Sequence, residues 1–277
     1  MIEAIVALLF GLIAGSFLNV CVHRWPRGRS VVKPRSHCVR CRKIISWYDN
    51  VPVLSYILLR GRCRYCGRHI SIRYPIVELT VGLLWFFFVY TVGPNANAAK
   101  MCIFTAMIVG LMFSDLEKRL LPDELTKGGV VIGLIFAVFV PVPDITGGAL
   151  LWIFGGHEVT GRYHWIAESV VGAFLPALFL WGGGKIYEII RKREGLGLGD
   201  VKLIAMVGAF LGLRYALMTL ILGSIAGSIL GFIYIKATKQ DPNTYQLPFG
   251  TFLGAAALLV AVSGQTIFGW YSGLTTF

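Results

Sequence analysis

The sequence has 277 residues, of which 56% are hydrophobic and 14% are charged. Soluble domains have roughly 45–50% apolar and about 25% charged residues, so an ordinary soluble enzyme, a disordered chain and a disulfide-rich secreted domain are excluded. The apolar residues gather in runs such as 2–21, 79–92 and 217–235, which approach the ~20 residues that cross a bilayer. The composition therefore predicts an all-α polytopic membrane protein.

Basic residues outnumber acidic residues by 26 to 14, giving a formal net charge of +12. Half of the basic residues lie in the segment 23–75, where Asp49 is the only acid. Such a block is typical of a nucleic-acid-binding patch or of a cytosolic loop that obeys the positive-inside rule. Because it lies directly between two apolar runs, we expect a cytosolic loop near anionic lipid headgroups and no nucleic-acid partner.

The first apolar segment resembles a retained membrane helix more than a cleaved signal peptide. It has no basic region at its start, where the only charge is Glu3, and basic residues follow its end at once. Its apolar stretch is also longer than the short hydrophobic region of a signal peptide. We expect a first membrane span with its N-terminus outside.

Eight membrane spans are predicted in all, at approximately 2–22, 76–92, 98–115, 128–142, 165–184, 201–213, 215–236 and 247–264. Starting outside, this topology gives the cytosolic segments 23–75, 116–127, 185–200 and 237–246, which contain nearly all the Lys and Arg. The expected domains are a first transmembrane helix over 1–22, a basic cytosolic domain over 23–75 and a helical membrane domain over 76–277. A further loop, 143–164, is expected outside.

The predicted span 201–213 is too short to cross a membrane alone. It covers about 20 Å at 1.5 Å per residue, against a hydrocarbon core of about 30 Å. Gly195, Gly197 and Gly199 precede it, followed directly by Asp200. Irregular backbone at membrane depth must be buried in protein or line a wet cavity. The glycine run is therefore either a loop that carries Asp200 into the helix bundle or a flexible connector at the surface.

Four cysteines form two CxxC pairs, Cys38 with Cys41 and Cys63 with Cys66. This pattern is typical of a four-thiolate zinc site, which leaves no position for water, so the metal would be structural. Disulfides are the alternative, but cytosolic thiols stay reduced. A domain this small also benefits from a metal staple.

Asp115 ends one predicted span and Asp200 precedes another, both at the cytosolic side. Ionisable groups at membrane depth are usually functional. Two carboxylates in one dry site cannot both ionise, and such a pair can activate a water and protonate a leaving amine. Three alternatives remain from spacing alone: helix caps, a proton- or cation-coupled transporter, and a noncatalytic zinc-stapled assembly factor.

Several motifs, in order along the chain, resemble the bacterial prepilin peptidases (type IV leader peptidases), which belong to the GxGD-type intramembrane aspartic proteases. Residues 197–200 match GxGD, and residues 115–126, with Pro122 and Asp123, resemble the first-aspartate motif of this family. The N-terminal part resembles the family in the segments 15–20, 24–26, 49–52 and 73–78 and in both CxxC pairs.

The resemblance implies that Asp115 and Asp200 are the catalytic pair, within a site loop that contains Gly197 and Gly199, and that Asp123 is noncatalytic. It also implies that Cys38, Cys41, Cys63 and Cys66 hold Zn²⁺. The implied reaction removes the basic leader of type IV prepilins or type II secretion pseudopilins after a glycine, on the cytosolic side of the bacterial inner membrane. N-methylation of the new N-terminus by S-adenosylmethionine is implied too, with no residue assigned to it.

Overall fold

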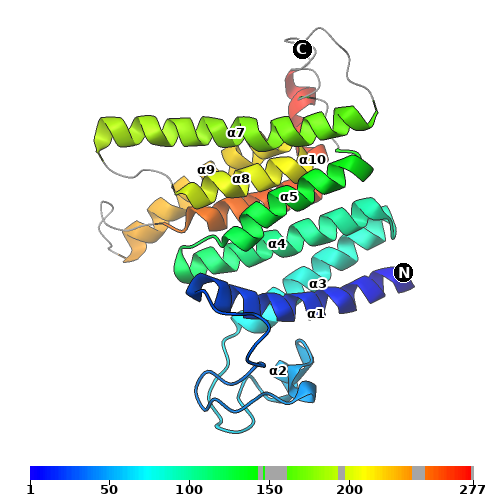
Figure 1. Cartoon of the computed structure of the whole chain (residues 1–277), viewed down its shortest axis with the longest axis vertical. Helices are drawn as coiled ribbons and strands as arrows, with labels where there is room; N and C mark the ends of the chain where they lie inside the picture. Colours follow the sequence, from blue (N-terminus) through cyan, green and yellow to red (C-terminus); the bar gives the residue numbers. More distant parts are fainter. Residues whose placement is uncertain (143–145, 147–160, 193–196, 239–246, 276–277) are drawn as a thin grey trace. The chain divides into compact units, whose positions relative to one another are not determined.

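The computed structural model describes residues 1–142, 146, 161–192, 197–238 and 247–275 (Figure 1). Within these ranges every regular element is a helix, accompanied by two isolated β-bridges. The chain divides into two compact units, Met1–Ser114 and Asp115–Phe277. Most of the expected outer loop 143–164 lies outside the described residues, as do 193–196, with Gly195, and most of the expected cytosolic segment 237–246.

Among the described residues, six helices are long and apolar enough to cross a membrane. They are α1 (Ile2–Arg24), α3 (Arg73–Val92), α4 (Ala96–Lys118), α7 (Arg162–Arg191), α9 (Leu213–Thr238) and α10 (Phe249–Thr275). The other two expected spans correspond to α5 (Asp123–Phe139) and α8 (Leu198–Leu211), which have only 17 and 14 residues. The all-α polytopic class is confirmed, whereas the count of eight spans is not.

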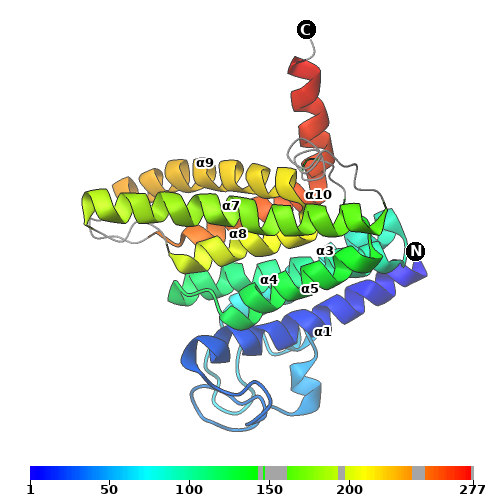
Figure 2. The same ribbon diagram turned by 45° about the horizontal axis from the view of Figure 1, so that its top comes forward.

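In the first unit, α1 and α3 lie side by side (Figures 1 and 2). Glycines make this approach close: a Cβ atom on Gly11 would lie 2.8 Å from Cα of Gly82, and one on Gly15 would lie 2.7 Å from Cα of Glu78. Small residues are typical of packed membrane helices, because they let two backbones come together. A side chain at Gly11 or Gly15 would therefore force the two helices apart.

The segment between α1 and α3 contains the 3-10 turns η1 (Trp25–Arg27) and η2 (Trp47–Asn50) and the short helix α2 (Leu54–Leu58). A hydrogen bond fastens this segment to α3: the buried Glu78 accepts at Oε2 from the N–H of Val53 at 2.8 Å. The two flanking helices are also bonded to each other, because Asn19 of α1 donates through Nδ2 to the carbonyl of Tyr74 in α3 at 3.1 Å. Val53 has φ +60°, a conformation rare for a β-branched residue.

In the second unit, α8 is the central helix and packs against α5, α7, α9 and α10. Every residue from Met206 to Leu211 is buried. A Cβ atom on Gly208 would collide with the backbone of Gly172 in α7, and Ser169 donates through its hydroxyl to the carbonyl of Ala209 at 2.6 Å. Helices surround α8, so it does not need the length of a lipid-exposed span.

Candidate active site and metal centre

Asp115 is buried near the end of α4, with 5% of its surface exposed. Its Oδ2 atom accepts two hydrogen bonds from Thr251, one from the backbone N–H at 2.7 Å and one from the hydroxyl at 2.9 Å. Thr251 lies in the first turn of α10, where N–H groups lack intrahelical acceptors and the helix dipole attracts an anion. The carboxylate of Asp115 therefore caps a helix distant in the sequence, and the two Thr251 donors stabilise its anion.

Asp200 is partly buried in the first turn of α8, outside the six candidate spans. Burial and the negative charge of Asp115 raise the pKa of Asp200 to about 7. A carboxylate in the first turn of a helix would normally be favoured as an anion, but here the other two effects are larger. Asp200 is thus about half protonated at pH 7, and its carboxyl group interacts with the negative charge of Asp115.

Leu121, after α4, touches the helix starts that carry this site. Its Cδ1 atom lies 3.1 Å from the position of a Cβ on Gly199 and 3.0 Å from that of a Cβ on Gly250. A Cβ on Gly250 would also lie 3.2 Å from Oδ2 of Asp115. Gly197 has more room, since its nearest neighbour is Oδ2 of Asp200 at 3.4 Å. A side chain at 199 or 250 would therefore displace Leu121 or the carboxylate of Asp115 by a few tenths of an ångström.

Gly250 and Thr251 were not singled out from the sequence, where 247–264 was expected to be an ordinary span. The local signal is the order Pro248, Phe249, Gly250, Thr251 immediately before an apolar run. Proline and threonine are typical of helix starts. That signal predicts where α10 begins, but it does not identify a partner 136 positions away.

Asp123 has a different environment from Asp115. It begins α5 with 48% of its side chain exposed, and Lys202 and Lys127 each approach one of its carboxylate oxygens at 2.6 Å. Hydrogen bonds from Lys127 and Lys202 lower the pKa of Asp123. Asp123 is therefore an ionised member of a surface ion-pair network.

The four predicted cysteine ligands lie together in the first unit. Their Sγ atoms are all within 4.8 Å of one another, and Cys38 and Cys66 are 3.9 Å apart. Zinc–sulfur bonds of about 2.3 Å in a tetrahedron place the sulfurs about 3.8 Å apart. The cluster of Cys38, Cys41, Cys63 and Cys66 has the spacing and the donor atoms to hold one metal ion.

The two CxxC turns have the same backbone geometry. In the first turn, Cys38 donates to the carbonyl of Lys43 at 3.0 Å and accepts from the N–H of Arg42 at 2.9 Å. In the second, Cys63 makes the equivalent bonds, with Arg68 at 2.8 Å and with Gly67 at 2.9 Å. The residue after each second cysteine is left-handed, with φ +59° at Arg42 and +65° at Gly67.

The backbone of the first CxxC turn favours the thiolate form of Cys38. Burial disfavours its thiolate, but hydrogen bonds from the backbone of Cys41 and Arg40 outweigh burial and lower the pKa of Cys38 to about 7. The thiolate is the form that binds metal. At neutral pH a metal ion would therefore meet one ligand that is already about half deprotonated.

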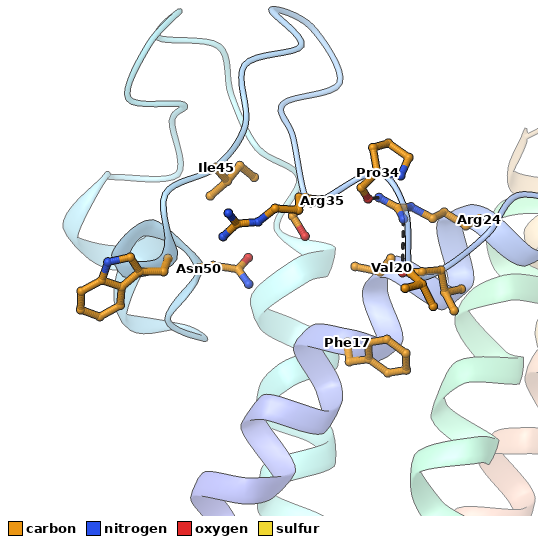
Figure 3. Close-up of a pocket in the computed structure, with 11 residues that line it drawn as sticks. Phe17, Val20, Arg24, Pro34, Arg35, Ile45 and Asn50 are labelled. Atoms are coloured by element: carbon orange, nitrogen blue, oxygen red, sulfur yellow. Dashed lines mark hydrogen bonds between the residues drawn. The ribbon is translucent and has the colours of Figure 1, made fainter.

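Arg24 orders the chain that leaves α1. Its guanidinium donates to three backbone carbonyls, at 3.0 Å (Ser30), 3.3 Å (Val31) and 2.7 Å (Pro34). Beside it lies a hollow of about 300 Å³, with apolar side chains of α1 on one wall and Arg35 and Asn50 on another (Figure 3). The shape of this hollow depends on the position in which Arg24 holds the chain.

Comparisons with known proteins agree with these features. One family model, the bacterial Peptidase A24 N-terminal domain, matches residues 9–92, and another, the type IV leader peptidase family, matches residues 102–232. The first range contains the four cysteines and the second contains both aspartates, whereas Thr251 lies beyond it. No solved structure matches the chain.

Three relatives, each named prepilin leader peptidase/N-methyltransferase, illustrate the similarity. The protein of Aeromonas salmonicida is 33% identical over 95% of this chain and 91% of its own length. That of Myxococcus xanthus is 36% identical over 89% of this chain and 69% of its own length. That of Pseudomonas aeruginosa is 30% identical over 94% of this chain and 90% of its own length.

Proposed function

Because this chain belongs to the type IV leader peptidase family, we propose that it is a membrane aspartic endopeptidase. It removes the leader of type IV prepilins and type II secretion pseudopilins after a glycine, on the cytosolic side of the bacterial inner membrane. The observation that carries this proposal is the unequal pair of carboxylates. Two donors and a helix start favour the anion at Asp115, while burial and the charge of Asp115 favour the acid at Asp200.

The two carboxyl groups divide the work of peptide hydrolysis. Asp115 accepts a proton from a water molecule, and the oxygen of that water forms a bond to the scissile carbonyl carbon. Asp200 donates its proton to the amide nitrogen as the carbon–nitrogen bond breaks, so the leader departs as an acid and the pilin as an amine. Transfer of one proton from Asp115 to Asp200 restores the starting state. This division matches general acid–base catalysis by a pair with separated pKa values.

A second activity, N-methylation of the new N-terminus, is inferred from the names of the relatives. S-adenosylmethionine is the substrate that supplies the methyl group. The amine that receives it does not exist until the peptide bond is cut, so methylation must follow cleavage. The relatives give no support to the alternative of a proton- or cation-coupled transporter.

We further propose that the four cysteines hold a structural Zn²⁺. The proposal is supported by their sulfur spacing and by an all-thiolate donor set, which leaves no site for water or substrate. The metal would staple a cytosolic domain over 23–75, between a transmembrane helix over 1–22 and a membrane domain over 76–277 that carries the peptidase site. The metal takes no part in the cleavage chemistry.

The proposal is tested with the full-length protein in lipid and a purified prepilin. Mass spectrometry should show leader loss after the glycine and, with S-adenosylmethionine present, addition of a methyl group to the product only. Asp115→Asn and Asp200→Asn should each abolish cleavage, since a catalytic pair acts as a unit. Cleavage at the wild-type rate by either variant would contradict the assignment of the pair.

A further inference from the structure

The start of α8 is joined to the start of α5 by an ion pair. Lys202 donates to Oδ1 of Asp123 at 2.6 Å, beside the contact between Gly199 and Leu121. We infer that Lys202 is a positioning residue of the peptidase: its ion pair with Asp123 holds the first turn of α8, and with it Asp200, beside the chain that follows Asp115. This inference rests on the proposed function, because it concerns the same pair of aspartates.

Contacts at later positions in α5 and α8 show why this ion pair influences the start of α8. At its other end the same helix pair is fixed by Gly133 of α5, whose Cβ position lies 2.8 Å from Cβ of Ala209 in α8. Asp123 precedes Gly133 in α5, and their partners Lys202 and Ala209 follow the same order in α8. The two helices therefore run in the same direction. Helix ends fray more readily than helix centres. The ion pair therefore controls the end of α8 that carries Asp200.

Lys202 acts on Asp200 through the helix rather than by touching it. Side chains two residues apart on a helix do not face each other, and the ammonium group of Lys202 is instead engaged by Asp123. The ion pair is solvent-accessible, with 34% of Lys202 and 48% of Asp123 exposed. Exposed pairs contribute little to stability, whereas a displacement of about 1 Å in a catalytic group can cost about 100-fold in rate. Loss of the pair should therefore affect catalysis more than folding.

The chain provides a matched control, because Asp123 has a second lysine partner. Lys127 pairs with Oδ2 of Asp123, also at 2.6 Å, but one turn along the same helix, so this pair does not connect α5 to α8. Lys202→Met and Lys127→Met each remove one positive charge from the same carboxylate. We expect Lys202→Met to lower kcat at least about 10-fold with KM within about twofold of wild type, and Lys127→Met to leave both unchanged.

Two further variants separate positioning from a general loss of structure. Lys202→Arg keeps the bridge and should recover most of kcat. The double variant Lys202→Met with Asp123→Asn should be no slower than Lys202→Met, because both changes remove one interaction and their effects are not additive. Thermal unfolding of each variant should stay close to wild type.

Clear outcomes would overturn the inference. A wild-type kcat in Lys202→Met, an equal loss in Lys127→Met, or a loss confined to KM would each exclude a positioning role for Lys202. A wild-type protein that does not cleave prepilin would instead remove the proposed function itself. The wild-type assay, run beside the variants, distinguishes the two failures.

Discussion

Thr251 directs two hydrogen bonds onto a single oxygen of Asp115, from its N–H at 2.7 Å and from its hydroxyl at 2.9 Å. Both bonds fall on Oδ2, so in the proposed mechanism Oδ1 is the oxygen that takes a proton from water. Because the donors lie at the start of α10, the ionised state of Asp115 depends on a helix that the aspartate motifs do not include.

Replacing Thr251 by valine removes the hydroxyl donor while keeping the branched shape and the backbone N–H. A hydrogen bond to a charged group contributes roughly 1.5–3 kcal/mol, so kcat should fall at least about 10-fold. Steady-state cleavage of a prepilin peptide measures the change. Thr238→Val, which removes a hydroxyl that bonds within α9, should leave kcat unchanged. Equal activity in the two variants would argue against a role for the Thr251 hydroxyl.

The rate of cleavage should depend on the proton held by Asp200. Its pKa is raised to about 7 by burial and by the charge of Asp115, so the acid form is lost as the pH rises through neutrality. We expect kcat/KM to decline above about pH 7, measured at constant ionic strength in lipid. A rate that stays level up to pH 9 would show that Asp200 is not the acid.

The same pKa has a consequence for stability. Because the pKa of Asp200 is raised in the folded protein, the folded state binds more protons than the unfolded state, and the free energy of unfolding falls between about pH 4 and pH 7. The Asp200→Asn variant does not have this loss. Its free energy of unfolding minus that of the wild type should therefore increase with pH, by on the order of 4 kcal/mol at pH 8. Thermal unfolding at pH 5 and pH 8 measures the difference.

Asp123→Asn gives the opposite sign and serves as the control. Lys127 and Lys202 lower the pKa of Asp123, so its contribution to stability is present at neutral pH and is lost as the pH falls. This variant should therefore be slightly less stable than wild type at pH 8 and equal to it in acid. A gain in stability at pH 8 for Asp123→Asn would contradict these environments.

Valine at position 199 tests the close packing on Leu121, whose Cδ1 lies 3.1 Å from the Cβ position of Gly199. We expect Gly199→Val to reduce kcat at least about 10-fold, since the first turn of α8 must move away from Leu121. Gly182→Val is the matched control, because nothing lies within 4 Å of its Cβ position. Wild-type turnover in Gly199→Val would show that this packing is not needed.

Metal analysis tests the cysteine cluster. Wild-type protein should contain about one zinc per chain, and Cys63→Ser should lose it, because a four-thiolate site needs all four ligands. Cys102→Ser changes a thiol that lies buried in α4, away from the cluster, and should retain zinc. Equal zinc in Cys63→Ser and wild type would exclude this ligand set.

The sequence predicted those parts of the protein that are local in the chain. The two CxxC pairs are short motifs, and the cysteines do lie together. The eight predicted spans each correspond to a helix, because apolar runs are local signals. The position of Asp115 near the end of a helix and of Asp200 at the start of another also followed from where the apolar runs begin and end.

The features that sequence reasoning missed are contacts between distant segments. Thr251 reaches Asp115 across 136 positions, and Lys202 reaches Asp123 across 79. The shortness of α8 is a local property of the sequence, whereas its place among four other helices is not, because the composition of a helix does not say which neighbours surround it. The roles of glycines such as Gly208 and Gly250 can likewise be recognised only from the atoms packed against them in the structure.

The fastening of the cysteine-containing segment in the first unit has a mechanical consequence. Both of its ends continue from helices that pack closely at Gly11 and Gly15. Glu78 also accepts a hydrogen bond from the N–H of Val53 within the segment. Both ends of the segment are therefore held by two closely packed helices and not by a flexible linker. A force or a ligand that tilts it must also tilt the α1–α3 pair, so its orientation is set by the same helices that anchor this unit.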